Sequence, residues 1–492
     1  MSAAVLASVA GGLRWLRVAQ REHYVPGSVV RFARRWWTAT NWNIAIFTAI
    51  LIGAVGVWWW QPLGWTCLLL LTAPLGLSMR GTTSRLQWTP RLRRLGGLSA
   101  VILSLVIAVA LITGNPGWSV ALSASIPLVI ELSLAILAPI ERALGERWVS
   151  KARDKLASSG ARVVAITGSY GKTTTKGYVH HLLSSRLATV STPGSFNNRM
   201  GLARAINEHL TPGTEIFVAE MGTYGKGEIA DLCEFVPPEV SAITSIGPVH
   251  LERFGSEEAI VEAKTEILAN ARAAVLNVDH PLLARLADRE GAIRKVIRAS
   301  GSDIDADVSV VEGVLRLAGE TIGRVGPEVF ETNLAIAAAV AAHYGVPNGE
   351  IARRLATLPV PPHRRQQSAS ELGFLIIDDT YNSNPAGAAG ALELLCSLPG
   401  EGRRVVVTPG MVELGRRQFE ENRAFARAIA ERSSDLLVVG LTNRRALVQG
   451  ARDGAATVIV LSSRQEAVEW IRSRLGPGDA VLYENDLPDH YP

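Results

Sequence analysis

The chain has 492 residues, of which 48% are hydrophobic and 19% are charged, and its formal net charge is +5. Its mean hydropathy of +0.19 is high for a soluble enzyme, and its length predicts two to four domains. A nucleic-acid-binding protein is disfavoured, because the arginines of the first 150 residues cluster beside apolar runs. Three widely spaced cysteines, Cys67, Cys233 and Cys396, predict neither a disulfide framework nor a zinc site.

Residues 1–150 are rich in tryptophan and in apolar residues, and eleven of the twelve tryptophans lie at or before Trp148. A helix that crosses a membrane needs about 20 apolar residues, with a range of about 17 to 25. We therefore predict an all-α transmembrane region here, although Pro74 interrupts one of its runs; buried helices of a soluble domain are the alternative. The four predicted transmembrane helices span about 42–60, 63–79, 98–114 and 118–139.

Basic residues set the expected orientation of this region. Lys and Arg precede the first run at 31–35, separate the second from the third at 80–94, and follow the fourth at 142–155. The connections near Gln61 and at 114–117 contain none. Because cytoplasmic loops collect Lys and Arg, we expect a multi-pass plasma-membrane protein with both ends of the region, and the domains after it, in the cytosol.

Residues 1–18 have their basic residues after the apolar ones, which is the wrong order for a signal peptide. An amphipathic segment on the membrane surface is the preferred interpretation.

From residue 161 onward, short β-branched runs alternate with helical stretches, which predicts parallel sheets with crossover helices. A Pro-rich basic linker at 359–366 divides this part. We expect a P-loop central ATP-binding domain at 151–362 and a smaller Rossmann-like C-terminal domain at 363–492, so the fold class is α/β. The predicted strands are 162–167, 215–220, 240–246, 273–278, 374–380, 403–409, 435–440, 456–461 and 479–484.

The segment "GSYGKTTTK" at 168–176 follows the first of these strands and reads as a phosphate-binding loop. Its two glycines are separated by two residues instead of the usual four. Such a turn aims backbone N–H groups and a helix N-terminus at phosphate. Lys172 would neutralise the β- and γ-phosphates, and the hydroxyl of Thr173 or Thr174 would hold Mg²⁺.

Polar side chains follow later strands. Glu220 ends its strand and is a candidate metal ligand, with a helix cap or a surface carboxylate as the alternative. His250 also follows a strand, although a lone histidine is more often structural. Lys264 lies in a helical pattern and by itself predicts a solvated surface lysine. Asp378 and Asp379 follow another strand and predict ribose or metal binding, or a helix cap.

Seven motifs occur in one order over about 161–440 and together resemble the Mur ligases, the ATP-dependent amide-forming ligases of peptidoglycan synthesis. The resemblance is strongest to the branch that adds D-alanyl-D-alanine. The motifs are "GSYGKTTTK", "TPGSFNNRMGL", "AEMGTYGKGEIA", "SIGPVHLERFGS", "AKTEIL", "DDTYNSNP" and "MVELG".

The resemblance implies roles for individual residues. Glu220 would hold one Mg²⁺, His250 would help to hold a second, and Lys264 would carry a CO₂-derived carbamate that acts as a metal ligand. Asn197 and Asn198 would face the acceptor. The implied ATP-binding residues are Gly168, Ser169, Gly171, Lys172, Thr173, Thr174, Asn333, Asp379 and either Arg364 or Arg365.

The chain also departs from the family pattern. Four predicted membrane helices replace the domain that holds the UDP-sugar, Gly410 occupies the place of an Asp, and the closing Lys-Gly-Ser pattern is absent. The implied reaction makes an acyl phosphate from an acceptor carboxylate and ATP, and an amino acid or dipeptide amine then attacks it. The acceptor is a UDP-linked muropeptide or, alternatively, a lipid-linked envelope precursor. A transport ATPase is disfavoured, because Glu131 alone is ionisable within the four runs.

Overall fold

The computed structural model describes residues 2–38, 41–72, 77, 86–115, 117–223, 225–248, 254–359, 363–381 and 383–487. The chain separates into two compact units, of which one contains Met1–Glu146 and the other is Arg147–Asp486. Each unit has its own buried cores, and the two are described in turn.

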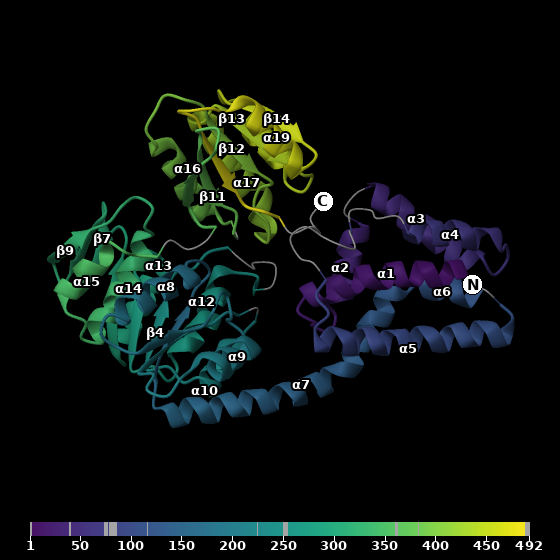
Figure 1. Cartoon of the computed structure of the whole chain (residues 1–492), viewed down its shortest axis with the longest axis horizontal. Coiled ribbons are helices and arrows are strands. Elements are labelled where there is room, and N and C mark those ends of the chain that lie inside the picture. Colours follow the sequence, from purple (N-terminus) through teal and green to yellow (C-terminus); the bar gives the residue numbers. More distant parts are fainter. Residues whose placement is uncertain are drawn as a thin grey trace. The chain divides into compact units, whose positions relative to one another are not determined.

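The described part of the first unit contains helices and turns but no strand (Figure 1). Two aromatic and aliphatic clusters form its interior, one around Trp15, Phe32 and Trp36 and the other around Ile50 and Cys67. The helices are α1 (Ser2–Arg21), α2 (Ser28–Trp37), α3 (Asn41–Gly56), α4 (Pro62–Thr72), α5 (Pro90–Thr113), α6 (Gly117–Ala124) and the first part of α7 (Ile126–Ser159).

Helices occur in the described part of all four predicted transmembrane runs, but their bounds differ, and residues 73–76 and 78–79 of the second run lie outside the described residues. Of the helices described, α5 alone is long and apolar enough to cross a membrane, and the bent pairs α2–α3 and α6–α7 raise the number of candidate spans to three. Helix α4 has 11 residues. Helix α5 begins before the apolar run, because Thr89 caps it through its side chain and Pro90 suits the first turn. The four-span arrangement therefore stays a prediction.

Glu131, the single ionisable residue within the predicted runs, has a structural role. Its Oε2 accepts hydrogen bonds from the backbone N–H groups of Val29, at 3.0 Å, and Val30, at 3.1 Å, and Oε1 accepts one from Gly27. These N–H groups are at the N-terminus of α2, where a helix leaves donors unsatisfied. Glu131 thus caps α2 from a distant helix.

The second unit contains two sheets, each mainly parallel. The central sheet has the order β2-β3-β1-β4-β5-β6-β7-β8-β9, and its last three strands form an antiparallel meander that the sequence did not predict. Its strands are β1 (Arg162–Thr167), β2 (Thr189–Ser191), β3 (Ile216–Glu220), β4 (Val240–Ile243), β5 (Ala273–Asn277), β6 (Lys295–Ser300), β7 (Val308–Val311), β8 (Val314–Leu317) and β9 (Glu320–Arg324).

The C-terminal sheet has the order β10-β11-β15-β12-β13-β14, with β10 as an antiparallel edge strand. A strand occurs in each of the nine predicted runs. The bounds are β10 (Gln366–Ala369), β11 (Leu375–Asp379), β12 (Arg404–Thr408), β13 (Asp435–Val439), β14 (Thr457–Leu461) and β15 (Ala480–Glu484).

Helices cover these sheets. Those of the central domain are α8 (Lys172–Leu183), α9 (Arg199–His209), α10 (Glu228–Phe235), α12 (Glu257–Thr265), α13 (Pro281–Gly291), α14 (Glu331–His343) and α15 (Asn348–Leu355). Those of the C-terminal domain are α16 (Pro385–Ser397), α17 (Gln418–Arg432), α18 (Arg444–Gly450) and α19 (Arg464–Arg474).

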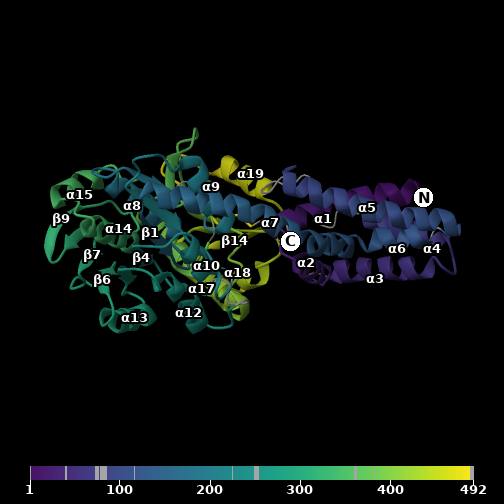
Figure 2. The same ribbon diagram turned by 90° about the horizontal axis from the view of Figure 1, so that it is seen from below.

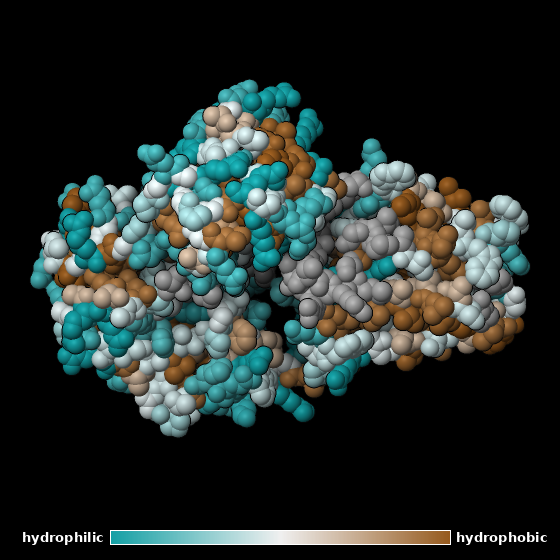
Figure 3. Space-filling view, turned by 45° about the horizontal axis from the view of Figure 1, so that its top comes forward, coloured by the Kyte–Doolittle hydropathy of each residue, from teal (hydrophilic) through white to brown (hydrophobic). Residues whose placement is uncertain are grey.

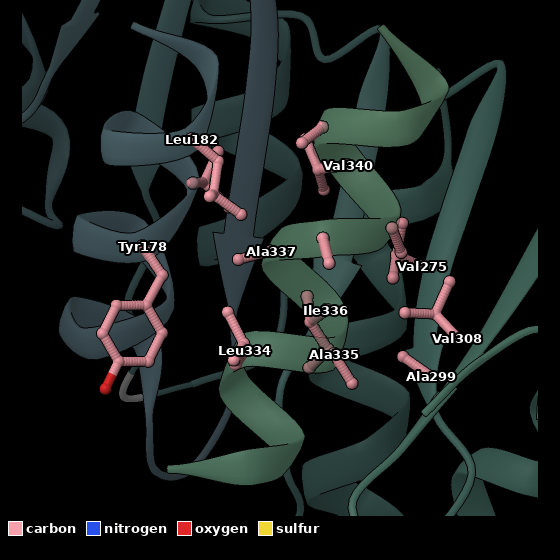
Figure 4. Close-up of a cluster of buried hydrophobic side chains, with 14 of the residues drawn as sticks. Tyr178, Leu182, Val275, Ala299, Val308, Leu334, Ala335, Ile336, Ala337 and Val340 are labelled. Carbon is pink, nitrogen blue, oxygen red and sulfur yellow. The ribbon is translucent and has the colours of Figure 1, made fainter. Parts of the chain in front are cut away.

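Helix α14 is the central packing element behind the phosphate loop. Its alanine-rich sequence lets it lie close to α8 and to the sheet, and its residues from Leu334 to Ala341 are buried. Figure 4 shows Tyr178 and Leu182 of α8 on one side of it and Val275 of β5 on the other. This packing fixes the start of α8, and with it the phosphate loop, against the N-terminus of α14.

Candidate functional site

The phosphate loop joins β1, which lies between β3 and β4 in the central sheet, to α8. Gly171 has the left-handed backbone angle φ = 78°, and an added Cβ would lie 2.6 Å from Oδ1 of Asn333. Gly168 is equally constrained, since its Cβ would collide with the hydroxyl of Thr244. Glycine is therefore required at both positions. Lys172 Nζ donates a hydrogen bond to the Gly168 carbonyl at 2.8 Å, which folds its side chain back over the loop.

Glu220 lies beside this loop, because β3 and β1 are neighbours and Glu220 pairs in register with Ile166. Its carboxylate is 1% exposed and accepts three hydrogen bonds. Thr173 Oγ1 and Lys176 Nζ donate to Oε2 at 2.9 and 3.1 Å, and Asn197 Nδ2 donates to Oε1 at 3.1 Å. The arrangement connects the phosphate loop to the 192–198 loop through one carboxylate.

Lys264 is buried on α12 rather than solvated, so the interpretation based on the helical pattern alone is wrong. Burial lowers the pKa of its amine well below the ordinary value, and the nearby charge of Lys172 lowers it further. Among the described residues no carboxylate forms an ion pair with it. A buried lysine with a depressed pKa has a larger neutral fraction at pH 7, and the neutral amine is the nucleophilic form.

A cavity of about 860 Å³ lies between the loop, the N-terminus of α14 and the start of the C-terminal domain. Its lining includes Gly171, Thr174 and Asn333 from the central domain and Arg364 and Asp379 from the C-terminal domain. Pockets of this size hold nucleotide-sized ligands. The structure thus brings predicted residues from both sides of the linker to one cavity.

The two candidate arginines have different surroundings. Burial lowers the pKa of Arg364, while the charges of Tyr381, Asp379 and Glu220 oppose this shift. The charge of Glu220, on β3 beside the phosphate loop, thus acts on Arg364, whose guanidinium also lies 4.8 Å from the Tyr381 ring centroid. Arg365 instead places its guanidinium 4.4 Å from the Phe330 ring centroid, and its backbone N–H donates to Asp379 at 3.1 Å. Both arginines line the cavity, and the nearby charge of Glu220 makes Arg364 the stronger candidate for contacting phosphate.

Several other predicted site residues make contacts that do not point to a role in binding nucleotide or metal. Asn198 caps α9, since its side chain accepts a hydrogen bond from Gly201 N at 2.9 Å. The Ser169 hydroxyl donates a hydrogen bond to the Gly247 carbonyl at 3.3 Å. Asp378 is bonded to His363 at 2.7 Å. His250 lies outside the described residues.

Lys176 and Asp279 were not among the predicted site residues. Burial by itself would raise the pKa of Asp279, but hydrogen bonds from Ser300, Gly301, Ser302 and Thr332 lower it below its ordinary value. Asp279 lines the cavity and fixes Thr332, the neighbour of Asn333. It lies two residues after the end of β5, so the strand-end argument used for Glu220 would have found it. Lys176 is the last residue of the quoted loop motif, and its contact depends on tertiary structure.

A second carboxylate is buried in the C-terminal domain. Glu484 ends β15 and is 0% exposed. Its oxygens accept hydrogen bonds from the hydroxyls of Ser383 and Thr408, the latter at 2.6 Å. Burial raises the pKa of Glu484 to about 8, and the nearby charge of Asp379 acts in the same direction. Glu484 is therefore largely protonated at neutral pH.

The oxygen ligands at the phosphate loop fit Mg²⁺. In the described part of the chain, no group of three His, Cys, Asp or Glu side chains comes together. Mg²⁺ bound with phosphates usually takes only one or two protein ligands and completes its shell with water and phosphate oxygens. Glu220 and the Thr173 hydroxyl, 2.9 Å apart, supply such a pair.

The fold and the site define an α/β P-loop protein in which two sheet domains contribute to one nucleotide-sized cavity. The Mur ligase middle domain matches residues 166–326, and the Mur ligase glutamate ligase domain matches residues 363–483. The chain belongs to the Mur ligase family and is an ATP-dependent ligase.

Individual relatives agree with this assignment. The UDP-N-acetylmuramoyl-tripeptide–D-alanyl-D-alanine ligase of Mycobacterium bovis is 31% identical over an alignment of 363 residues, and the match covers 67% of this chain and 71% of the relative. The crystal structure of MurF ligase from Thermotoga maritima in complex with ADP is 27% identical with a TM-score of 0.60 and covers 70% of this chain and 80% of that one. MurF from Acinetobacter baumannii, at 23% identity and a TM-score of 0.60, shares the fold over 70% of this chain and 77% of its own.

Proposed function

We propose that this ligase joins a D-alanyl-D-alanine-type dipeptide to the terminal carboxylate of a muropeptide, with ATP as the energy source. The observation that carries the proposal is that Glu220 and Arg364 lie close enough to Lys172 of the phosphate loop for their charges to act on it. Similarity to ligases named for this reaction supports the choice of substrates. In the proposed reaction the acceptor carboxylate attacks the γ-phosphate of ATP, and the amine then displaces phosphate from the acyl phosphate.

The residues of the loop supply the electrostatic part of this reaction. Lys172 and the N-terminus of α8 stabilise charge on the transferred phosphoryl group, and Arg364 adds a cation from the opposite domain. Glu220 and Thr173 would hold Mg²⁺, which neutralises the phosphates when it is bound. We also propose that Lys264 is carbamylated, because its amine is buried with a lowered pKa, which favours the neutral form that reacts with CO₂, and the resulting carboxylate suits a second metal.

Attachment to the plasma membrane belongs to the same proposal. Figure 3 shows hydrophobic residues gathered on the helices of the first unit, whereas hydrophilic residues predominate on the visible face of the second. Leu69, Ile112 and Trp59 are 72%, 85% and 82% exposed. Such a surface is costly in water and favourable in lipid. The catalytic domains would then lie in the cytosol, close to envelope precursors.

A lipid-linked muropeptide is the second candidate acceptor, favoured by this apolar surface. An assay of phosphate release by the full chain in detergent distinguishes the two acceptors. D-alanyl-D-alanine and ATP are supplied with either the UDP-linked or the lipid-linked muropeptide, and the two rates are compared. Release with neither acceptor above the ATP-only rate would refute the ligase proposal.

A fragment without the first unit would show whether membrane attachment is required. It should begin at Arg147 rather than after α7, because Val149, Ala152 and Leu156 belong to the core of the central domain. Full activity of this fragment on the UDP-linked acceptor would identify the first unit as an anchor alone.

A further inference from the structure

Helix α1 is an integral part of the first unit and runs along its length (Figure 2). Its small residues pack closely: Ala4 and Ala7 are buried, and the hydroxyls of Ser8 and Ser123 are 2.9 Å apart. Close approach through Ala and Ser is typical of helices that associate within a membrane. The expectation of a separate surface-bound segment does not fit this packing.

The direction of α1 follows from its contacts in chain order. Ser123 on α6 donates to the Ala4 carbonyl at 3.2 Å, Arg14 donates to the Thr72 carbonyl at the end of α4 at 2.7 Å, and Gln20 donates to the Gln87 carbonyl at 2.7 Å. Thus α1 runs parallel to α4 and to the path from α6 into α7. It ends near the start of α5.

We call the end of the unit formed by residues 57–65, 112–115 and 117–118 the distal end, and the end formed by 28–38 and 86–94 the proximal end. The rings of Trp58 and Trp118, 5.2 Å apart, hold the two distal connections together. Between these ends, α1, α3, α4, α5 and α6–α7 alternate in direction, and α4 ends at Thr72, beside Arg14 of α1, while the described chain resumes at the proximal end with residue 86.

Charge agrees with this alternation. Residues 2–13, 36–72 and 95–141 contain no Lys or Arg, so the distal end has none. Every arginine of α1 lies in its proximal half. Those of α2 and α5 are also proximal, and two of them, Arg91 and Arg94, contact Glu141. In the distal half of α1, the exposed Leu6 and Val9 are apolar, at 70% and 56% exposure, which suits contact with lipid.

Helix α1 contains Arg14 and the buried Arg17, and it is not among the helices apolar enough to be candidate spans. The Arg14 guanidinium donates to the carbonyls of Leu71 and Thr72, the unsatisfied acceptors at the end of α4. With 20 residues, α1 is about 30 Å long, enough for a hydrocarbon core. From these observations we infer that α1 is the first of five membrane passages. Ser2 then lies on the side of the membrane opposite to the catalytic domains.

This inference rests on the proposed membrane attachment, and one labelling experiment separates the two. Single cysteines are introduced by Ser2→Cys, Gln61→Cys, Thr38→Cys and Ser158→Cys into the full chain carrying Cys396→Ser. The remaining Cys67 and Cys233 are buried, and the Cys396→Ser chain alone serves as the blank. Intact cells are treated with a membrane-impermeant maleimide, and labelling is compared with that after permeabilisation, which shows that each introduced thiol is accessible.

We expect full labelling of Ser2→Cys and Gln61→Cys in intact cells, and labelling of Thr38→Cys and Ser158→Cys only after permeabilisation. If Gln61→Cys reacts in intact cells but Ser2→Cys does not, the five-passage inference is wrong and membrane attachment stands. If none of the four reacts before permeabilisation, the membrane attachment itself is wrong and the inference fails with it.

Discussion

The ammonium of Lys176 lies 3.1 Å from Oε2 of Glu220, and the two side chains are only 6% and 1% exposed. Lys176 also donates to the Gly194 carbonyl, so one buried cation joins α8, the end of β3 and the loop before α9. Removing either partner of such a buried ion pair lowers stability, because the remaining charge is left buried and uncompensated.

Replacing this cation should be costly. We expect Lys176→Met to lower the free energy of unfolding by about 3–5 kcal/mol, measured by chemical denaturation of the full chain in detergent. Lys226→Met is the matched control, because Lys226 and Glu262 form an exposed pair that should contribute less than about 1 kcal/mol. Equal losses in the two variants would show that burial adds nothing to the Lys176–Glu220 pair.

The contact between Gly171 and Asn333 predicts an effect on nucleotide binding. Gly171→Ala places a Cβ 2.6 Å from Asn333 Oδ1 at a left-handed backbone position. We expect ADP affinity, measured by calorimetry, to fall about tenfold, or about 1.4 kcal/mol, as Asn333 is displaced.

Gly160→Ala tests whether backbone strain alone accounts for this loss. Gly160 has the same kind of backbone angle, but nothing lies within 4 Å of its added Cβ. The Gly160→Ala variant should be less stable than the natural chain but should bind ADP with the same affinity. An unchanged affinity for Gly171→Ala would remove the contact with Asn333 from the nucleotide site.

Glu484 predicts a pH dependence of stability. Its pKa in the folded protein is about 8, against an ordinary value of 4.5. Between these values the folded state holds a proton that the unfolded state has lost, so stability should fall as pH rises from about 5 to 8. The total is on the order of 4 kcal/mol.

Thermal unfolding across this pH range, compared between the natural chain and Glu484→Gln, isolates the contribution. The amide keeps a hydrogen-bonding group of similar shape next to Ser383 and Thr408 but cannot titrate. Parallel pH profiles for the two proteins would mean that Glu484 does not carry the folded-state proton.

The carbamate proposed on Lys264 predicts that an added carboxylic acid can replace it. Lys264→Ala should retain the fold and ADP binding but lose nearly all ligation, because the proposed carbamate ligand is absent. A short carboxylic acid added to this variant should restore part of the activity, while the same acid should leave the natural chain unchanged. Rescue is the decisive measurement, since a merely structural lysine would not respond to a carboxylate.

The sequence by itself determined the class of this protein. Strand–helix alternation placed all nine predicted strands, since local β-branched runs between helical patterns specify parallel sheets. The position of Glu220 beside the phosphate loop was also predictable, because carboxyl ends of parallel strands share one edge of a sheet. The resemblance to Mur ligases rested on ordered motifs, and the family assignment agrees with it.

Tertiary structure decided what depends on contacts between distant residues. Pattern alone made Lys264 a surface lysine, but the packing of α12 buries it. Glu131 looked like an isolated acid in an apolar run, yet it caps α2 some 100 residues earlier in the chain. The partner of Lys176 and the direction of α1 could not be predicted from the sequence either. Periodicity and local propensity report which face of an element is apolar, whereas the neighbour that meets this face is set by the folding of the whole chain.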